Sequence, residues 1–190
     1  MLLGYVLGSI PFGLLLTRFA GLGDVRDIGS GNIGATNVLR TGRKGLAAVT
    51  LILDAAKGAA AVLIAQAIWP DANLGGVAGI AAFLGHLYPV WLRFRGGKGV
   101  ATMIGIVAAL LWPAALIVVA VWLLALAVSR RSSVGGMSGA LAAPVATFVL
   151  GRLDLTILFL GFALLILWTH RANIARLIDG TEPRVGKARG

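Results

Sequence analysis

Long apolar runs, separated by short polar and glycine-rich breaks, make up most of this chain of 190 residues. Runs of this length are too apolar to face water, and a soluble core of this size could not bury them all. The pattern predicts an all-α integral membrane protein with one transmembrane domain over residues 1–190. Seven transmembrane helices are expected, some of them short, at residues 2–20, 46–69, 74–92, 100–111, 114–128, 137–150 and 155–169.

The number of transmembrane helices depends on residues 100–128, which form either two short helices or one long kinked helix. Residues 100–111 span roughly 18 Å, whereas the hydrocarbon core is roughly 30 Å thick, so this segment crosses only if the bilayer thins locally. The basic residues favour two helices. With seven passes Arg152 is the only basic residue between the runs on the outer side, whereas six passes place Arg130 and Arg131 wrongly. We therefore predict an outer N-terminus and a cytosolic C-terminus.

This topology places the glycine-rich polar segments together on the cytosolic face. They are residues 21–45, 93–99, 130–136 and the tail from His170, whereas the outer connections, near residues 70–73, 112–113 and 151–154, are short. Any chemistry is thus expected at the cytosolic surface.

The composition excludes several classes of site. The chain has no cysteine, so it forms no disulfide or thiolate metal site and has no cysteine nucleophile, and its two histidines lack metal-binding spacing. We predict no metal. The net charge of +10 does not indicate nucleic-acid binding, because the basic residues lie between apolar runs and are not interleaved with aromatic side chains. It fits membrane topology, with a secondary attraction to anionic lipids or phosphorylated substrates.

The first candidate loop covers residues 30–40, SGNIGATNVLR. Its glycines let backbone N–H groups converge on an anion, and the guanidinium of Arg40 matches phosphate oxygens. The loop therefore favours a phosphate site built from Ser30, Gly31, Asn32, Asn37 and Arg40. The alternative is a plain turn whose side chains satisfy its own backbone.

The second candidate loop, residues 94–102, reads FRGGKGVAT and precedes a helix expected from residue 100. Successive amides and Lys98 at a helix N-terminus suit a phosphate, which makes Gly96, Gly97 and Gly99 candidate ligands as well. The spacing is not that of a nucleotide-hydrolysing P-loop, because Gly99 replaces the magnesium-binding Ser or Thr. The alternative is basic topology residues combined with flexible glycines.

Charged residues also occur inside or next to apolar runs. Asp54 and Lys57 are three residues apart and can pair on one helix face, where a structural ion pair is at least as well supported as catalysis. His86 is interpreted as a hydrogen-bonded packing histidine. For His170, Asn173 and Glu182 in the tail, function and helix capping remain equal alternatives.

Five groups of residues occur in order along the chain: 8–13, 27–37 with Arg40, 54–58, 85–86 with 96–102, and 170–174 with 180–182. With these residues the chain resembles, over almost its whole length, the bacterial acyl-phosphate-dependent glycerol-3-phosphate acyltransferases, a family of small membrane enzymes. The resemblance implies a single transmembrane catalytic domain. It also implies a multi-pass protein of the bacterial cytoplasmic (inner) membrane, with the active site on the cytosolic face.

The resemblance implies transfer of a fatty acyl group from acyl phosphate to the sn-1 hydroxyl of glycerol 3-phosphate. The products would be lysophosphatidic acid and phosphate, in the first step of phospholipid synthesis. The implied partners are these two substrates and membrane lipid, with no cofactor, nucleic acid or obligate protein partner.

The candidate site residues follow from the loops and the resemblance together. In the third cytosolic segment, residues 130–136, which we call loop three, the resemblance implies a serine donor. The choice between Ser132 and Ser133 stays open, with Ser133 preferred. The catalytic candidates are Ser30, Asn32, Arg40 and His170; the substrate-binding candidates are Gly31, Asn37, Gly96, Gly97, Lys98, Gly99, Ser133 and Asn173; the structural candidates are Asp54, Lys57 and Glu182.

The sequence shows no obvious catalytic dyad, because neither histidine is followed by an aspartate five residues on. We hypothesise that the phosphate of the donor accepts the hydroxyl proton, while Ser30, Asn32 or backbone amides stabilise the oxyanion. The rival hypothesis is an organic-phosphate permease or channel. It is weaker because the polar loops lie on one side and no inverted repeat is visible.

Overall fold

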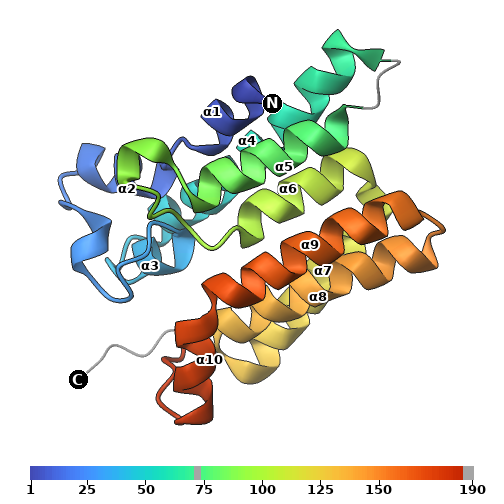
Figure 1. The fold of residues 1–190 in the computed structure, drawn as a ribbon. Helices are drawn as coiled ribbons and strands as arrows, with labels where there is room; N and C mark the ends of the chain where they lie inside the picture. The colour runs from blue at the N-terminus through green and yellow to red at the C-terminus, as the bar shows by residue number, and fades with distance from the viewer. Residues whose placement is uncertain (71–73, 186–190) are drawn as a thin grey trace. The chain divides into compact units, whose positions relative to one another are not determined.

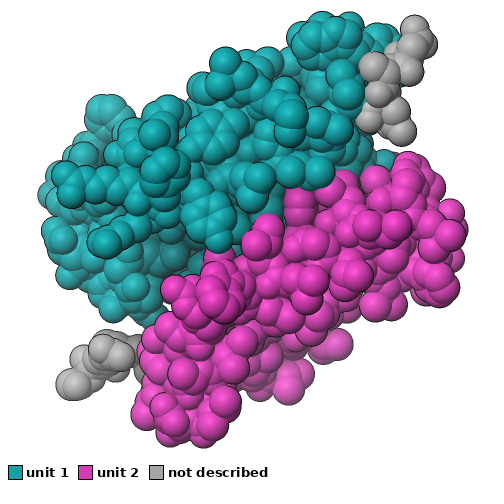
Figure 2. Space-filling view, viewed as in Figure 1, with its two compact units in different colours: residues 1–110 teal, residues 111–190 magenta. Residues whose placement is uncertain are grey.

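A computed structural model describes residues 1–70 and 74–185, and over these residues it contains helices and no strands. The chain divides into two compact units, Met1–Leu110 and Leu111–Gly190 (Figures 1 and 2). The all-helical prediction is confirmed. The single catalytic domain over residues 1–190 stays a prediction.

The first unit is built around the long helix α4, which packs against α1, α2, α5 and α6 (Figure 1). Its loops connect helices of very different length. The elements are α1 (Leu2–Gly8), α2 (Phe12–Phe19), η1 (Val25–Asp27), α3 (Ala35–Leu39), α4 (Lys44–Ile68), α5 (Gly75–Leu87), η3 (Val90–Leu92) and α6 (Val100–Leu110).

The first predicted helix, residues 2–20, is wrong in one respect, because it is broken into α1 and α2. The two pieces are bent by 42° relative to each other. Pro11 occupies the N-cap of α2, and its missing N–H and restricted φ interrupt a continuous helical ladder.

Glycines let the helices of the first unit approach closely. A Cβ at Gly8 would collide with the backbone of Ala82 in α5, and one at Gly105 would collide with the backbone of Ala55 in α4. Small residues at a helix crossing are typical of membrane proteins, where association depends on close packing. These contacts fix the helix ends from which the loops extend.

The second unit contains α7 (Trp112–Ser129), α8 (Ser132–Val149), α9 (Leu153–Thr169) and α10 (Arg171–Ile178). Helix α8 packs against both α7 and α9. The prediction of a polar loop over residues 130–136 is wrong, because α8 begins at Ser132. The glycines do not break this helix, since Gly135 lies against Trp122 of α7 where a side chain would not fit easily.

Among the residues that the structure describes, four segments are long and apolar enough to cross a membrane: Lys44–Ile68, Gly75–Leu92, Trp112–Ser129 and Ser132–Val149. The bent pairs α1 with α2 and α9 with α10 raise the number to as many as six. Helix α6 is apolar but has only 11 residues. Seven passes would need α6 to cross as well, so that count stays a prediction.

The connection between α6 and α7 bears on the six-pass alternative. Leu111 between them has an extended backbone, with φ −158° and ψ 81°, so the two helices are separate and do not form one kinked rod. The predicted outer turn at residues 70–73 lies almost wholly outside the described residues, which omit 71–73.

Candidate active site

The first loop is organised by the side chain of Asn37, which is only 1% exposed. Its amide nitrogen donates to the carbonyl oxygens of Val25 and Ile28, at 2.6 and 3.0 Å. Its amide oxygen accepts from the backbone N–H of Ser30 at 3.1 Å and from the guanidinium of Arg40 at 3.2 Å. We call these five residues the Asn37 cluster. It gathers two predicted catalytic residues, Ser30 and Arg40, around one buried amide.

The remaining residues of the first loop shape its backbone. Gly29 and Gly31 have φ of +57° and +69°, a region that costs little only for glycine. A Cβ at Gly29 would also collide with Arg40 and Asn37. The side chain of Asn32 accepts from the N–H of Gly34 at 2.9 Å, so in this structure it closes a local turn.

A small cluster of buried apolar side chains packs against the first loop. Its buried members are Leu14, Val25, Ile33, Val38 and Ala47, and Leu92 packs against it. Because Leu92 lies two residues before the second loop, this cluster packs against the first loop and against the segment that leads into the second.

The second loop is held by the C-terminal end of α5. The N–H groups of Gly96 and Gly97 donate to the carbonyl oxygens of Leu87 and His86, both at 3.0 Å. A Cβ at Gly96 would collide with the carbonyl of His86, and a Cβ at Gly97 with its imidazole ring. Gly99 has φ +88° and lies against Phe83. Lys98 is thereby placed just before α6, which begins at Val100 as predicted.

The predicted pairing of Asp54 with Lys57 is present. The Lys57 ammonium lies 2.7 Å from the Asp54 carboxylate and also donates to the carbonyl of Ile10 at 2.7 Å. The pair therefore ties α4 to the break between α1 and α2. His86 is buried as expected, but the predicted hydrogen bond is wrong for Nδ1, which has no hydrogen-bond partner and lies 3.7 Å from Asp54.

In the second unit the tail folds back onto α8 through Glu182, which is buried. One carboxylate oxygen accepts from the Ser133 hydroxyl and the Asn173 amide, both at 2.6 Å, and the other accepts from Arg176 at 2.7 Å. We call these four residues the Glu182 cluster. It joins the start of α8, α10 and the tail.

The pKa of Glu182 lies below its ordinary value. Burial of the carboxyl acts to raise the pKa, but the hydrogen bonds from Ser133, Asn173 and Arg176 together outweigh burial. The carboxylate therefore stays ionised at neutral pH and holds its three donors.

His170 lies between α9 and α10 and is 4% exposed. Its Nδ1 is 2.8 Å from the carbonyl oxygen of Ile166. A carbonyl can only accept, so Nδ1 carries a hydrogen and donates it to Ile166. This bond fixes the orientation of the imidazole ring at the start of α10.

Comparison with known proteins places this geometry in a family. The family model described as glycerol-3-phosphate acyltransferase matches residues 1–180. The chain is 53% identical over 186 residues to the glycerol-3-phosphate acyltransferase of Brucella anthropi, covering 98% of this chain and 92% of that protein. It is 58% identical over 184 residues to the enzyme of Maricaulis maris, covering 96% and 84%.

Solved structures agree. The glycerol 3-phosphate form of PlsY, an integral membrane glycerol 3-phosphate acyltransferase, matches with a TM-score of 0.90 at 38% identity, over 96% of this chain and 92% of that chain. Its lysophosphatidic acid form matches with a TM-score of 0.89 at 37% identity, over 97% and 93%. The chain belongs to the glycerol-3-phosphate acyltransferase family. It is an integral membrane enzyme of that family.

Within this acyltransferase the predicted site residues fall into two groups. The first unit holds Ser30, Gly31, Asn32, Asn37, Arg40 and the glycine-rich second loop with Lys98, and the second unit holds Ser133, His170, Asn173 and Glu182. Ser133, rather than Ser132, is the loop-three serine that bonds Glu182.

Some predicted substrate donors already have protein partners. The polar atoms of Asn37 bond the first loop itself, and Ser133 and Asn173 donate to Glu182. Sequence reasoning did not select Arg176. Arg176 lies six residues before Glu182, on the other side of the end of α10. No helical spacing in the sequence therefore indicated that the two residues would pair.

Proposed function

We propose that this acyltransferase moves a fatty acyl group from acyl phosphate to the sn-1 hydroxyl of glycerol 3-phosphate, as the first step of phospholipid synthesis. The observation that supports this best is the Asn37 cluster. It holds a serine and an arginine together on a loop that continues into α3. Such a loop suits binding and orienting a phosphorylated substrate whose leaving group is already activated.

The reaction balances without an external acid. The sn-1 oxygen attacks the acyl carbonyl carbon, the bond from that carbon to the phosphate oxygen breaks, and the hydroxyl proton passes to the departing phosphate. The products are lysophosphatidic acid and phosphate. Holding the hydroxyl against the carbonyl could lower the barrier by roughly 7–11 kcal/mol.

In this proposal Arg40 and Lys98 bind phosphate, and Ser30 with backbone amides stabilises the developing oxyanion. The carbonyl groups of α5 and the ring of His86 fix the glycines of the second loop, so Lys98 is held by a rigid support. His170, whose ring is oriented by the bond from Nδ1 to the carbonyl of Ile166, is the catalytic candidate of the second unit. The Glu182 cluster positions Ser133 and Asn173.

The topology is part of the proposal. We infer seven passes with α6 crossing as a short helix, an outer N-terminus, and a cytosolic C-terminus and active site in the cytoplasmic membrane of a bacterium. The positive charge between the apolar runs supports this arrangement. The chain has no cysteine of its own, so single cysteines at the exposed positions Arg43 and Asp154 can report sidedness. Labelling of Asp154→Cys from outside, but not of Arg43→Cys, is expected.

The decisive experiment follows phosphate release by purified enzyme in detergent or lipidic mesophase. We expect release to require both acyl phosphate and glycerol 3-phosphate, and acyl-CoA to give none. Arg40→Ala and Lys98→Ala should lose release, whereas Lys44→Ala, an exposed cation at the start of α4, should keep it.

Two outcomes would contradict the proposal. A burst of phosphate from acyl phosphate alone would indicate an acyl-enzyme intermediate in place of direct transfer. Uptake of glycerol 3-phosphate by liposomes containing the protein, with no phosphate release in detergent, would favour the permease.

A further inference from the structure

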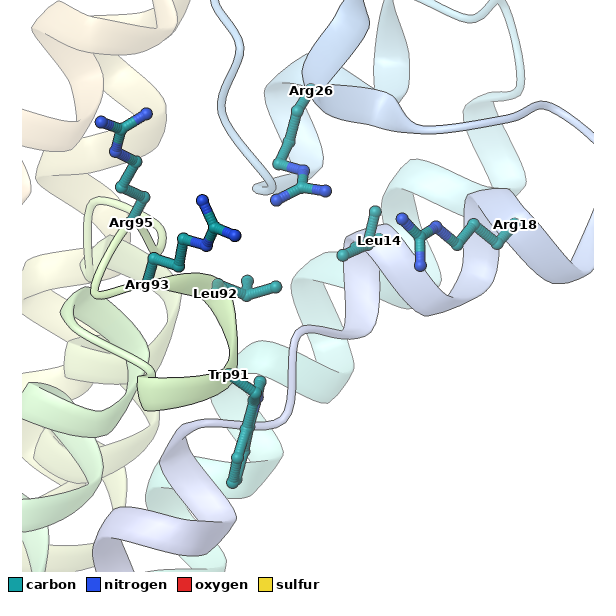
Figure 3. Close-up of a pocket in the computed structure, with 7 residues that line it drawn as sticks. All are labelled: Leu14, Arg18, Arg26, Trp91, Leu92, Arg93 and Arg95. Carbon is teal, nitrogen blue, oxygen red and sulfur yellow. The ribbon is translucent and has the colours of Figure 1, made fainter.

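A basic cavity of about 450 Å³ lies in the first unit, and neither of the predicted phosphate ligands Arg40 and Lys98 lines it (Figure 3). Four arginines and three apolar side chains line it: Arg18, Arg26, Arg93, Arg95, Leu14, Trp91 and Leu92. Its volume lies within the range of roughly 300–1,000 Å³ found for small-ligand sites. We call it the arginine cavity.

Two of the arginines are fixed in place by one carboxylate. Asp24 accepts from Arg26 at 2.6 and 2.9 Å and from Arg18 at 2.8 Å. The hydrogen bonds from Arg26 hold the pKa of Asp24 well below its ordinary range, so this side chain remains charged. Both guanidinium groups are therefore oriented before any ligand arrives.

The other two arginines carry charge that the described residues do not neutralise. Arg93 and Arg95 form no ion pair and no side-chain hydrogen bond with any residue in the ranges 1–70 and 74–185. Figure 3 shows the guanidinium groups of Arg26 and Arg93 extending from opposite sides toward the space over Leu92 and Leu14. An anion there would meet at least two guanidinium groups.

The backbone conformation at Arg93 is strained. Arg93 and Phe94 both adopt the left-handed region, with φ of 53° and 59°, at a cost of roughly 1–2 kcal/mol for each residue. Hydrogen bonds from both N–H groups to the carbonyls of Val90 and Pro89 hold the turn. Glycine would relieve the strain at position 93 but would remove the guanidinium from the cavity.

The apolar side of the cavity indicates what kind of anion fits. Trp91 is 51% exposed, while its indole N–H donates to the carbonyl of Ser9 at 2.9 Å, so the exposed part of the ring is apolar. Phe94, which follows Arg93 in sequence but does not line the cavity, is 60% exposed. Exposed tryptophan beside arginines is typical of the membrane interface, where lipid head groups lie.

We propose that the arginine cavity binds the phosphate group of an anionic phospholipid, at a site that shares the second loop through Arg95 but is lined by neither Arg40 nor Lys98. The guanidinium groups bind the phosphate oxygens in pairs, and the apolar rim contacts the start of the acyl chains. Free phosphate offers the same oxygens but lacks the chains, so the lipid binds more tightly.

The test measures binding by native mass spectrometry of the protein in neutral detergent, without acyl phosphate or glycerol 3-phosphate. Short-chain phosphatidylglycerol, short-chain phosphatidylcholine and inorganic phosphate are titrated separately. We expect phosphatidylglycerol to bind most tightly, and the double variant Arg93→Gln with Arg95→Gln to weaken it by about tenfold or more. The matched control is Arg43→Gln with Lys44→Gln, which removes the same charge from exposed positions outside the cavity.

A second variant guards against misfolding. Arg93→Gly suits the left-handed backbone, so it should keep the thermal stability of the wild type and still lose phosphatidylglycerol affinity several-fold. Equal loss in the control pair would overturn the site in favour of diffuse attraction. Inorganic phosphate binding as tightly as phosphatidylglycerol would overturn the lipid assignment. Neither result depends on acyl transfer, so the proposed reaction is tested separately.

Discussion

Asn37 in the first unit and Glu182 in the second are both buried polar side chains that bond several partners, and the two clusters are built differently. Asn37 is neutral and its partners lie within twelve residues along the chain, so the cluster stabilises a local loop. Glu182 is charged, and its partner Ser133 is 49 residues away. The first cluster shapes a loop, whereas the second attaches the tail to the start of another helix.

This difference has consequences for stability. A neutral amide has no protonation equilibrium near neutral or mildly acidic pH, so the Asn37 cluster should hold the first loop unchanged as pH falls. A buried carboxylate with three donors is strong only while it is ionised. The first loop should therefore be insensitive to acid, and the tail should not.

Glu182→Ala should have the largest effect. It leaves the Ser133 hydroxyl and the Asn173 amide buried without an acceptor, and Arg176 without its carboxylate, which should destabilise the tail by about 3 kcal/mol. Hydrogen exchange over residues 171–182 should rise sharply and phosphate release should fall at least tenfold. Asp179→Ala, an exposed acid at the end of α10, should leave both unchanged; a matching effect there would exclude a specific contribution of Glu182.

Asn37→Ala should come next, at about 1–3 kcal/mol. The carbonyls of Val25 and Ile28 lose their donor, and Ser30 and Arg40 lose their common acceptor. We expect faster exchange confined to residues 25–40 and a lower kcat/KM. Thr36→Ala, exposed on the same short helix, serves as the control. If Asn37→Ala exchanges like the wild type, the cluster does not hold the loop.

Acidification should separate the two clusters. The pKa of Glu182 is lower in the folded protein than in the unfolded chain, where it is about 4.3. The ionised carboxylate therefore contributes its full share to the free energy of unfolding above the unfolded-chain pKa. This contribution declines as pH falls through the lowered pKa of the folded protein. Hydrogen exchange followed from pH 6 to pH 3, corrected for the intrinsic exchange rate, should increase in the tail only at the acid end, with the first loop unaffected. Glu182→Gln should abolish this pH dependence; a slope that persists would assign it elsewhere.

Arg176→Gln should have the smallest effect. Its side chain is one-third exposed, so water screens the ion pair and the loss should be about 0.5–1 kcal/mol. Because Arg176 also lowers the pKa of Glu182, the acid transition of the tail should move to higher pH. A loss as large as that of Glu182→Ala would show that the ion pair, not the two neutral donors, holds the tail.

Much of the fold follows from local features of the chain. Apolar runs marked the helical regions, and the start of α6 after Gly99 was predicted to the residue. The ion pair of Asp54 with Lys57 followed from a spacing of three on one helix face. The break at Pro11 was not predicted, because the pattern of apolar residues continues through it.

The sequence predicted which residues belong to the candidate site, but it did not predict which residues contact one another there. Ser30 and Arg40 were selected, but their common partner Asn37 was expected to face a substrate. The glycines at 135 and 136 suggested a loop, yet both lie in α8, and at Gly135 the neighbouring helix α7 occupies the space that a side chain would need.

The amino-acid sequence alone thus indicates the membrane class, the helical regions, the family and the residues of the loops, since these depend on neighbours a few positions apart. Where each polar group finds its partner depends on how the helices pack. Ser133, Asn173 and Arg176 meet on Glu182, and Arg18, Arg26, Arg93 and Arg95 line one cavity. Buried polar groups must find partners, and packing, not sequence distance, determines which ones are within reach.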